Sequence, residues 1–147
     1  MEVLRLREYA IGIEDACEKL IISEIITSYK DYYSGNPYNT KFIVKVSSGD
    51  FSGTSMFEYN IKDFIDFVKE INRLYDFRTK KVNLKDISYG SNIEFSIDKA
   101  GHITISGNIF GESMEHSLIF KFVTDQSAMK TFCRSLYKDF IEEKSLE

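Results

Sequence analysis

The chain has 147 residues, a net charge of −4 and a sequence pI near 5.3, with 43% hydrophobic and 29% charged residues. This length and composition fit a single globular domain over residues 1–147 and exclude a disordered chain. The acidic balance argues against nucleic acid as a general partner, because such binders normally carry a basic surplus.

Location is indicated by three further features. No apolar run is long enough to cross a bilayer, and the N-terminal segment, residues 1–5, lacks the apolar core of a signal peptide. Cys17 and Cys133 are far apart and form no CxxC motif, which favours reduced core thiols. We therefore expect a cytoplasmic protein with no membrane partner.

Most of the chain alternates apolar and polar residues with a period of two, which indicates strands. In chain order the predicted strands are residues 3–11, 19–29, 41–47, 51–59, 82–88, 93–97, 103–109 and 118–122. Turns are expected at residues 12–17, 48–50, 89–91 and 98–101, and a long loop at residues 30–40. Gly107 is a possible β-bulge, and residues 142–147 are expected to be a frayed, charged tail.

A helix is predicted at Ile61–Tyr75, between the fourth and fifth strands. Phe64, Val68 and Ile71 share one face, and charged residues occupy the opposite face. Asn60 stands at the position of a helix N-cap. An amphipathic helix among strands has to cover a sheet, so this face is expected to lie in the core.

A second helix is predicted after Asp125, which is a suitable N-cap. Its apolar stripe contains Met129, Phe132 and Leu136, which we expect to be buried. The order of strands, helix, strands and helix predicts an α+β fold, with a largely antiparallel sheet and two amphipathic helices packed on it.

Catalytic chemistry finds little support in the sequence. His102 and His116 are expected far apart on consecutive strands, so no metal site is predicted. No GxSxG elbow and no glycine-rich phosphate loop is present, so neither a catalytic residue nor a cofactor is assigned. An enzyme would instead be indicated if two or more of His102, His116, Asp98 and Glu115 shared one deep cleft.

Two surface features are candidates for binding a partner protein. The loop contains Tyr29, Tyr32, Tyr33, Asn36 and Tyr38, and this composition is typical of protein-recognition surfaces. The alternative is that these tyrosines pack over a sheet edge. Lys130, Arg134 and Lys138 recur every four residues and form a basic stripe on the second helix, and most such stripes are solvated faces.

Short motifs along residues 29–140 resemble those of a known family. They are Phe51-Ser52-Gly53, Asp63-Phe64 with Phe67, Leu84, Ile93–Ile97, Gly101-His102-Ile103 with Gly107, Leu118–Phe122, and Asp125-Gln126-Ser127. This order resembles the immunity-protein family that protects bacteria from WapI-type wall-associated contact toxins, together with related uncharacterised bacterial proteins. Phe42 stands where members of that family often have Trp.

The resemblance implies a small cytoplasmic non-enzyme that binds a cognate toxin domain, often a nuclease, and blocks it. It carries no active-site residues over to this chain. A structural or adaptor module is the alternative function, and an enzyme with an unrecognised site is a second one. The sequence leaves the oligomeric state open.

Overall fold

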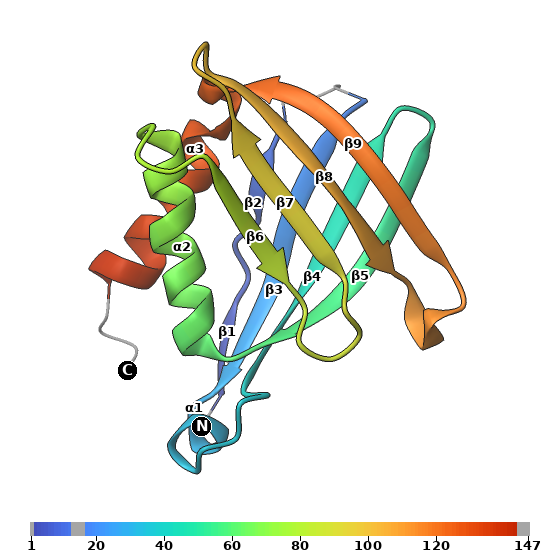
Figure 1. Cartoon of the computed structure of the whole chain (residues 1–147). Coiled ribbons are helices and arrows are strands. Elements are labelled where there is room, and N and C mark those ends of the chain that lie inside the picture. Colours follow the sequence, from blue (N-terminus) through green and yellow to red (C-terminus); the bar gives the residue numbers. More distant parts are fainter. Residues whose placement is uncertain (1, 13–16, 144–147) are drawn as a thin grey trace.

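Residues 2–12 and 17–143 are described by the computed structural model, and within them the chain forms nine strands and three α-helices (Figure 1). The strands are β1 (Glu2–Arg5), β2 (Tyr9–Ile11), β3 (Lys19–Ser28), β4 (Thr40–Ser48), β5 (Phe51–Tyr59), β6 (Lys81–Lys85), β7 (Asn92–Ile97), β8 (His102–Phe110) and β9 (Ser117–Asp125). The helices are α1 (Tyr29–Tyr33), α2 (Ile61–Tyr75) and α3 (Gln126–Tyr137), with a 3-10 turn η1 (Glu112–Met114) and a π-helical turn η2 (Lys138–Glu142). None of the described helices is long and apolar enough to cross a membrane.

The strands form two antiparallel sheets. In the first, β1, β3, β4 and β5 lie side by side and β2 also pairs with β3, while β6 to β9 follow one another in the second. The predicted α+β class, with antiparallel strands and two amphipathic helices, is confirmed. The division into two sheets was not predicted, because alternation shows which side of a strand is buried and not which strands pair.

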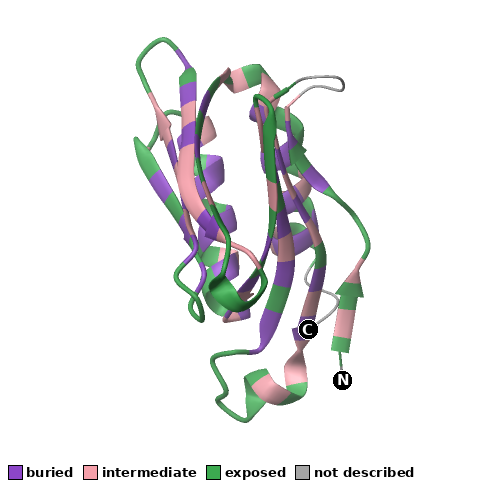
Figure 2. Cartoon of the chain, turned by 90° about the vertical axis from the view of Figure 1, so that its right-hand side faces the viewer, coloured by how far each residue is buried: buried purple, intermediate pink, exposed green. Residues whose placement is uncertain are grey.

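The core contains residues of both sheets and of the two long helices, and Figure 2 shows buried positions along all of these elements. Helices α2 and α3 pack on each other and lie along one side of the sheets (Figure 1). All six helix residues predicted to be buried are fully buried: Phe64, Val68, Ile71, Met129, Phe132 and Leu136.

A path of aromatic rings joins the first sheet to the second through α2. Ring centroids are 5.1 Å apart for Phe42 and Phe64, and 5.9 Å apart for Phe64 and Phe67. The path continues from Phe67 to Phe95 at 5.9 Å and from Phe95 to Phe132 at 6.4 Å. Such tilted pairs add to the stabilisation that comes from burying apolar area.

Both predicted helix caps are confirmed. The Oδ1 atom of Asn60 accepts a hydrogen bond from the N–H of Lys62 at 3.0 Å, and that of Asp125 accepts one from the N–H of Ala128 at 3.0 Å. After α3 the chain continues into η2, which brings Phe140 into the core.

The predicted strand at residues 3–11 is wrong, because two short strands, β1 and β2, occupy this segment. Both pair with β3, but the β3–β4 register shifts between Ser23 and Ile26, and Glu24 has a φ of 52°. This irregularity in β3 lies between its pairing with β2 and its pairing with β1, so one straight strand cannot follow both halves.

Gly107 is not a bulge, because the register of β8 with both β7 and β9 runs through it without a shift. A Cβ atom at this position would lie 2.2 Å from the carbonyl oxygen of Asn92. The glycine therefore permits a close approach between two strands, which is the other common reason for glycine within a strand.

Some predicted boundaries also change. The loop at residues 30–40 begins with helix α1, whose N-cap Ser28 accepts a hydrogen bond from the N–H of Asp31 through its Oγ atom at 3.2 Å. β6 ends at Lys85 instead of residue 88. Most of the turn predicted at 12–17 and most of the tail at 142–147 lie outside the described residues. Cys17 is exposed and so is not a core residue, whereas Cys133 is buried.

Candidate binding surfaces

The tyrosine loop forms an aromatic cluster at one end of the first sheet. Ring centroids lie 6.2 Å apart for Tyr29 and Tyr32, 6.3 Å for Tyr29 and Tyr33, and 5.2 Å for Tyr32 and Tyr33. Relative exposure is 37% for Tyr32, 73% for Tyr33 and 50% for Tyr38. Three large rings are therefore exposed to solvent on a short helix and the loop that follows it.

The base of this loop is fixed by hydrogen bonds. Asn36 accepts one from the N–H of Tyr38 at 2.9 Å through its side chain, and Asn39 donates one to the carbonyl of Asn36 at 2.9 Å. The buried Asn39 also accepts a hydrogen bond from the N–H of Ile61 at 2.8 Å, which ties the loop to the start of α2. Asn36 thus shapes the loop, and the exposed tyrosines are held by a rigid base.

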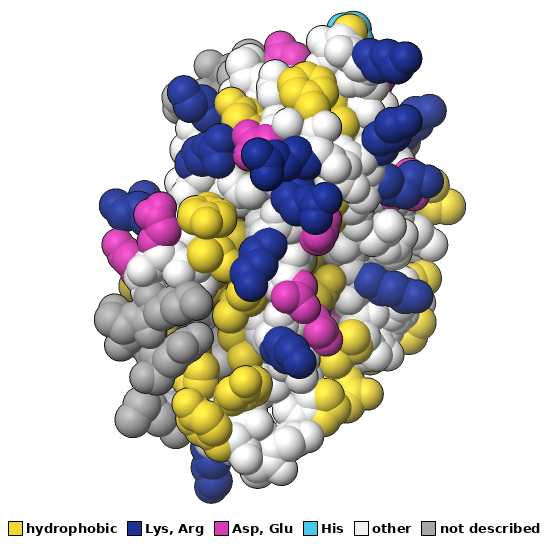
Figure 3. Space-filling view, turned by 60° about the vertical axis from the view of Figure 1, so that its left-hand side comes forward, with side chains coloured by type: hydrophobic (Ala, Val, Ile, Leu, Met, Phe, Trp, Pro, Cys, Tyr) yellow, Lys and Arg dark blue, Asp and Glu magenta, His cyan; other side chains and the backbone are white. Residues whose placement is uncertain are grey.

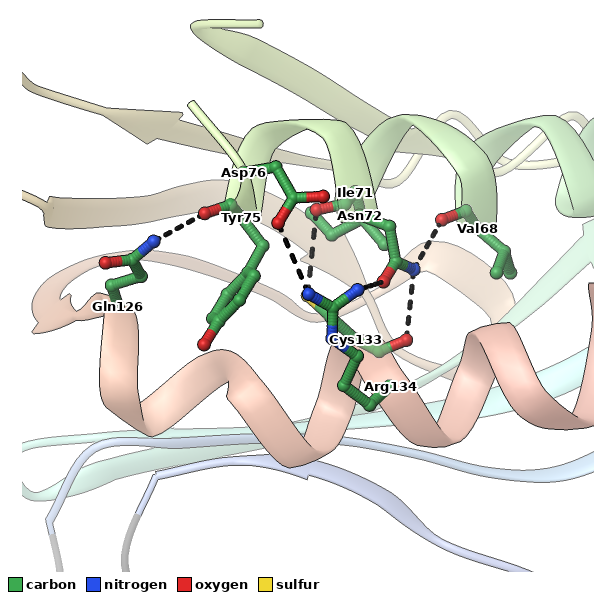
Figure 4. Close-up of polar contacts among 8 residues, drawn as sticks. All are labelled: Val68, Ile71, Asn72, Tyr75, Asp76, Gln126, Cys133 and Arg134. Carbon is green, nitrogen blue, oxygen red and sulfur yellow. Dashed lines mark hydrogen bonds and ion pairs between the residues drawn. The ribbon is translucent and has the colours of Figure 1, made fainter. Parts of the chain in front are cut away.

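The three residues of the basic stripe differ in their contacts. Arg134 donates hydrogen bonds of 3.3 Å to Asn72 and to Asp76, and its guanidinium lies 5.0 Å from the ring centre of Tyr75 (Figure 4). This side chain therefore joins α3 to α2. Lys130 and Lys138 are both exposed. Of the three residues, these two lysines are the ones with free reach toward a partner.

Charge on the face that bears the helices is mixed. Figure 3 shows Lys and Arg side chains spread over this face with Asp and Glu side chains between them. Glu70 and Arg73 form one such pair at 3.6 Å, with both side chains about half exposed. Because negative charges lie between the positive ones, the electrostatic potential of this face is weaker than three cations in a row suggest. The face therefore steers an acidic partner less strongly.

The side chains that an enzyme would need do not share one cleft. His102 contacts Asp98 at 3.0 Å, but both are exposed, Asp98 in the turn before β8 and His102 at the first residue of β8. His116 precedes β9 at the opposite end of the β8–β9 hairpin. Within the described part of the chain, no group of three or more His, Cys, Asp and Glu residues is placed to hold a metal ion. Burial raises the pKa of the Cys133 thiol to about 12, so this cysteine is not a ready nucleophile.

Sequence reasoning missed a hollow beside β5. A cavity of about 500 Å³ is lined mostly by apolar side chains from four separate segments: Ile43, Met56, Tyr89 and Phe110. A second cavity, of about 290 Å³, lies next to it and includes Phe51 and His116 in its wall. Thr54 and Gly111 line both cavities.

Two buried polar groups hold the walls of this hollow. The carboxylate of Asp86 accepts hydrogen bonds from the N–H groups of Glu58 at 2.8 Å and Tyr89 at 2.8 Å, so the β6–β7 connection is fastened to β5. Ser55 donates to the carbonyl oxygen of Phe110 at 2.6 Å and thereby joins β5 to the end of β8. An isolated Asp and Ser gave no signal of these roles in the sequence.

The fold and these surfaces define a small antiparallel α+β protein with an exposed, anchored aromatic loop and an apolar hollow. A family model described as the immunity protein WapI-like family matches residues 14–142, and the chain belongs to this family. Membership confirms the resemblance drawn from the motifs. It implies a non-enzymatic binding role in toxin immunity.

A comparison with solved structures adds information on the fold alone. The structure is similar to a chain in the crystal structures of MRP1/MRP2 from Trypanosoma brucei, with a TM-score of 0.54 and 8% sequence identity. The match covers 98% of this chain and 88% of that one. No curated protein matches the chain significantly.

Proposed function

We propose that this protein neutralises a cognate bacterial toxin domain in the cytoplasm by covering the surface through which the toxin acts. The family match over residues 14–142 is the observation that carries the proposal. The net charge of −4 supports a basic partner, such as a nuclease domain whose positive surface would otherwise meet nucleic acid. Complementary charge of this kind raises the association rate of a complex.

The interface is proposed to centre on the tyrosine loop, with Tyr32, Tyr33 and Tyr38 as its main contacts. Large rings on a fixed base lose little conformational entropy on binding, which favours them as anchors. Tyr29 supports the cluster from its base and Asn36 holds the turn. Lys130 and Lys138, and to a lesser degree Arg134, are proposed as a secondary surface that tunes the association rate.

Co-expression tests the proposal directly. An immunity gene is expected to lie beside its toxin gene, so the C-terminal domain of the toxin expected there is expressed from an inducible promoter, with this protein expressed from a second one. Growth is expected to be restored in proportion to the amount of this protein. If the cells die as fast as cells that lack it, the proposed function is wrong.

A further inference from the structure

The backbone of β5 has one free edge. The N–H of Glu58 donates to Asp86 and its carbonyl accepts from the N–H of Ile87 at 3.1 Å, so the peptide groups of Glu58 point away from β4. The β4–β5 register is continuous, and peptide directions alternate along an antiparallel strand. Met56, Thr54 and Ser52 therefore present their N–H and carbonyl groups on the same side as Glu58. Within the described chain, no strand pairs with β5 on that side.

All three of these residues line the hollow beside β5. Met56 and Thr54 line the cavity of about 500 Å³, and Thr54 and Ser52 line the cavity of about 290 Å³. The residues whose backbone groups are left unpaired by β4 are thus the residues of β5 that border the hollow. An extended polypeptide is the ligand whose donors and acceptors match such a row of backbone groups.

Three of the other edge strands carry charges that discourage pairing. Lys121 stands in the middle of β9, and β1 and β6 begin and end with charged residues. The short edge strand β2 has no charged residue but packs against α3. Residues 51–57 of β5 contain no charged side chain. Native proteins commonly protect exposed edges with charge, so an uncharged edge beside an apolar hollow is suited to a partner strand.

Charge and position further describe the partner. Glu112 lies on the rim of the larger cavity, is exposed, and has no ion pair within the described residues. The N–H of Glu58 donates a hydrogen bond to Asp86. Glu58 also lines a small cavity whose wall includes Tyr38 of the tyrosine loop. The β5 edge is therefore continuous with the surface proposed to bind the toxin.

We propose that the free edge of β5 binds an extended segment of the partner protein by strand addition. One apolar side chain of that segment enters the cavity formed by Ile43, Met56, Tyr89 and Phe110, and a basic side chain pairs with Glu112. This site deepens the proposed function and rests on it, since the partner is the toxin domain.

A matched pair of substitutions at Thr54 tests the site. Thr54→Pro removes the N–H group from the free edge without removing a bond to β4, whereas Thr54→Ala keeps that N–H group. Calorimetry with the purified toxin C-terminal domain is expected to give binding at least about tenfold weaker for Thr54→Pro and nearly unchanged for Thr54→Ala. Equal affinity for both variants, with unchanged melting temperatures, would overturn strand addition and leave the proposed function standing.

Hydrogen exchange of the unaltered protein gives an answer that does not depend on a variant folding. The amides of Ser52, Thr54 and Met56 are expected to exchange quickly in the free protein and to become protected in the complex. A second pair of variants compares Met56→Lys with Met56→Leu. Met56→Lys is expected to lose binding, and Met56→Leu is expected to keep it. A complex that forms without protecting these amides contradicts the site, and absence of any complex overturns the proposed function together with it.

Discussion

The hydroxyl of Tyr9 donates a hydrogen bond of 2.6 Å to the Oδ2 atom of Asp139, which lies 130 residues further along the chain. Arg7 pairs with the same oxygen at 3.0 Å, and the Asp139 carboxylate is largely buried. Burial alone would favour the neutral acid, but the hydrogen bonds from Tyr9 and Arg7 outweigh it and hold the pKa of Asp139 below its usual value. This contact fastens the N-terminal strands to the turn after α3.

Acid is therefore expected to weaken the fold through Asp139. A depressed native pKa stabilises the fold above the unfolded value of about 4, and this stabilisation is lost as the pH falls through the native pKa. Asp139→Asn should flatten the decline of the unfolding free energy between about pH 5 and pH 2, as measured by urea denaturation. Asp66→Asn on the exposed face of α2 is the control, and an equal flattening there would contradict the assignment.

Gly107→Ala is expected to destabilise the second sheet. The new methyl group would meet the carbonyl of Asn92, a backbone atom that cannot swing aside. Overpacking of this kind costs about 1–3 kcal/mol or more. Thermal denaturation should show the loss, and Ser106→Ala on the neighbouring position should leave the melting temperature nearly unchanged. A stable Gly107→Ala protein would mean that β7 and β8 separate easily.

Phe132→Ala is expected to cost about 3–5 kcal/mol, because the ring is fully buried and closes the aromatic path to Phe95. Chemical denaturation measures this loss. Lys130→Ala, on the exposed face of the same helix, serves as the control. Similar values for the two variants would show that this face of α3 is not packed as described.

Asn72 should contribute more than Arg134 to the stability of the contact between α2 and α3. The buried Asn72 amide donates to the carbonyls of Val68 at 2.9 Å and Cys133 at 3.0 Å (Figure 4), so Asn72→Ala leaves buried groups unpaired at a cost of about 1–3 kcal/mol. Arg134 and Asp76 are both about half exposed, and a double-mutant cycle should give a coupling below about 1 kcal/mol. A coupling energy between Arg134 and Asp76 larger than the loss of stability in Asn72→Ala would contradict this ranking.

Tyr33→Ala is expected to weaken toxin binding by about 2 kcal/mol or more while leaving the melting temperature nearly unchanged, because the ring is mostly exposed. Affinity and melting temperature are measured on the same preparation. Tyr59→Phe, a change within the core, is the control for affinity and is expected to leave toxin binding unchanged. If Tyr33→Ala lowers stability and not affinity, the search for the interface moves to Lys130 and Lys138.

The sequence was most informative where local periodicity sets the structure. The apolar stripes at Phe64 and Phe132 predicted both helices and their buried faces, and the tyrosine loop was located by composition. The free edge of β5 and the Tyr9–Asp139 contact depend on which distant segments meet. No local pattern records that information, because an edge is defined by the absence of a neighbouring strand.

The packing of α3 against β2 has a consequence for how the chain folds in the cell. The ribosome releases α3 after β2 and after every strand between them, so this part of the core cannot close until α3 has emerged. Until then the apolar faces of β3 and β4 stay exposed. The domain should therefore reach its native packing only after α3 has been made, and slow translation of α3 should increase aggregation.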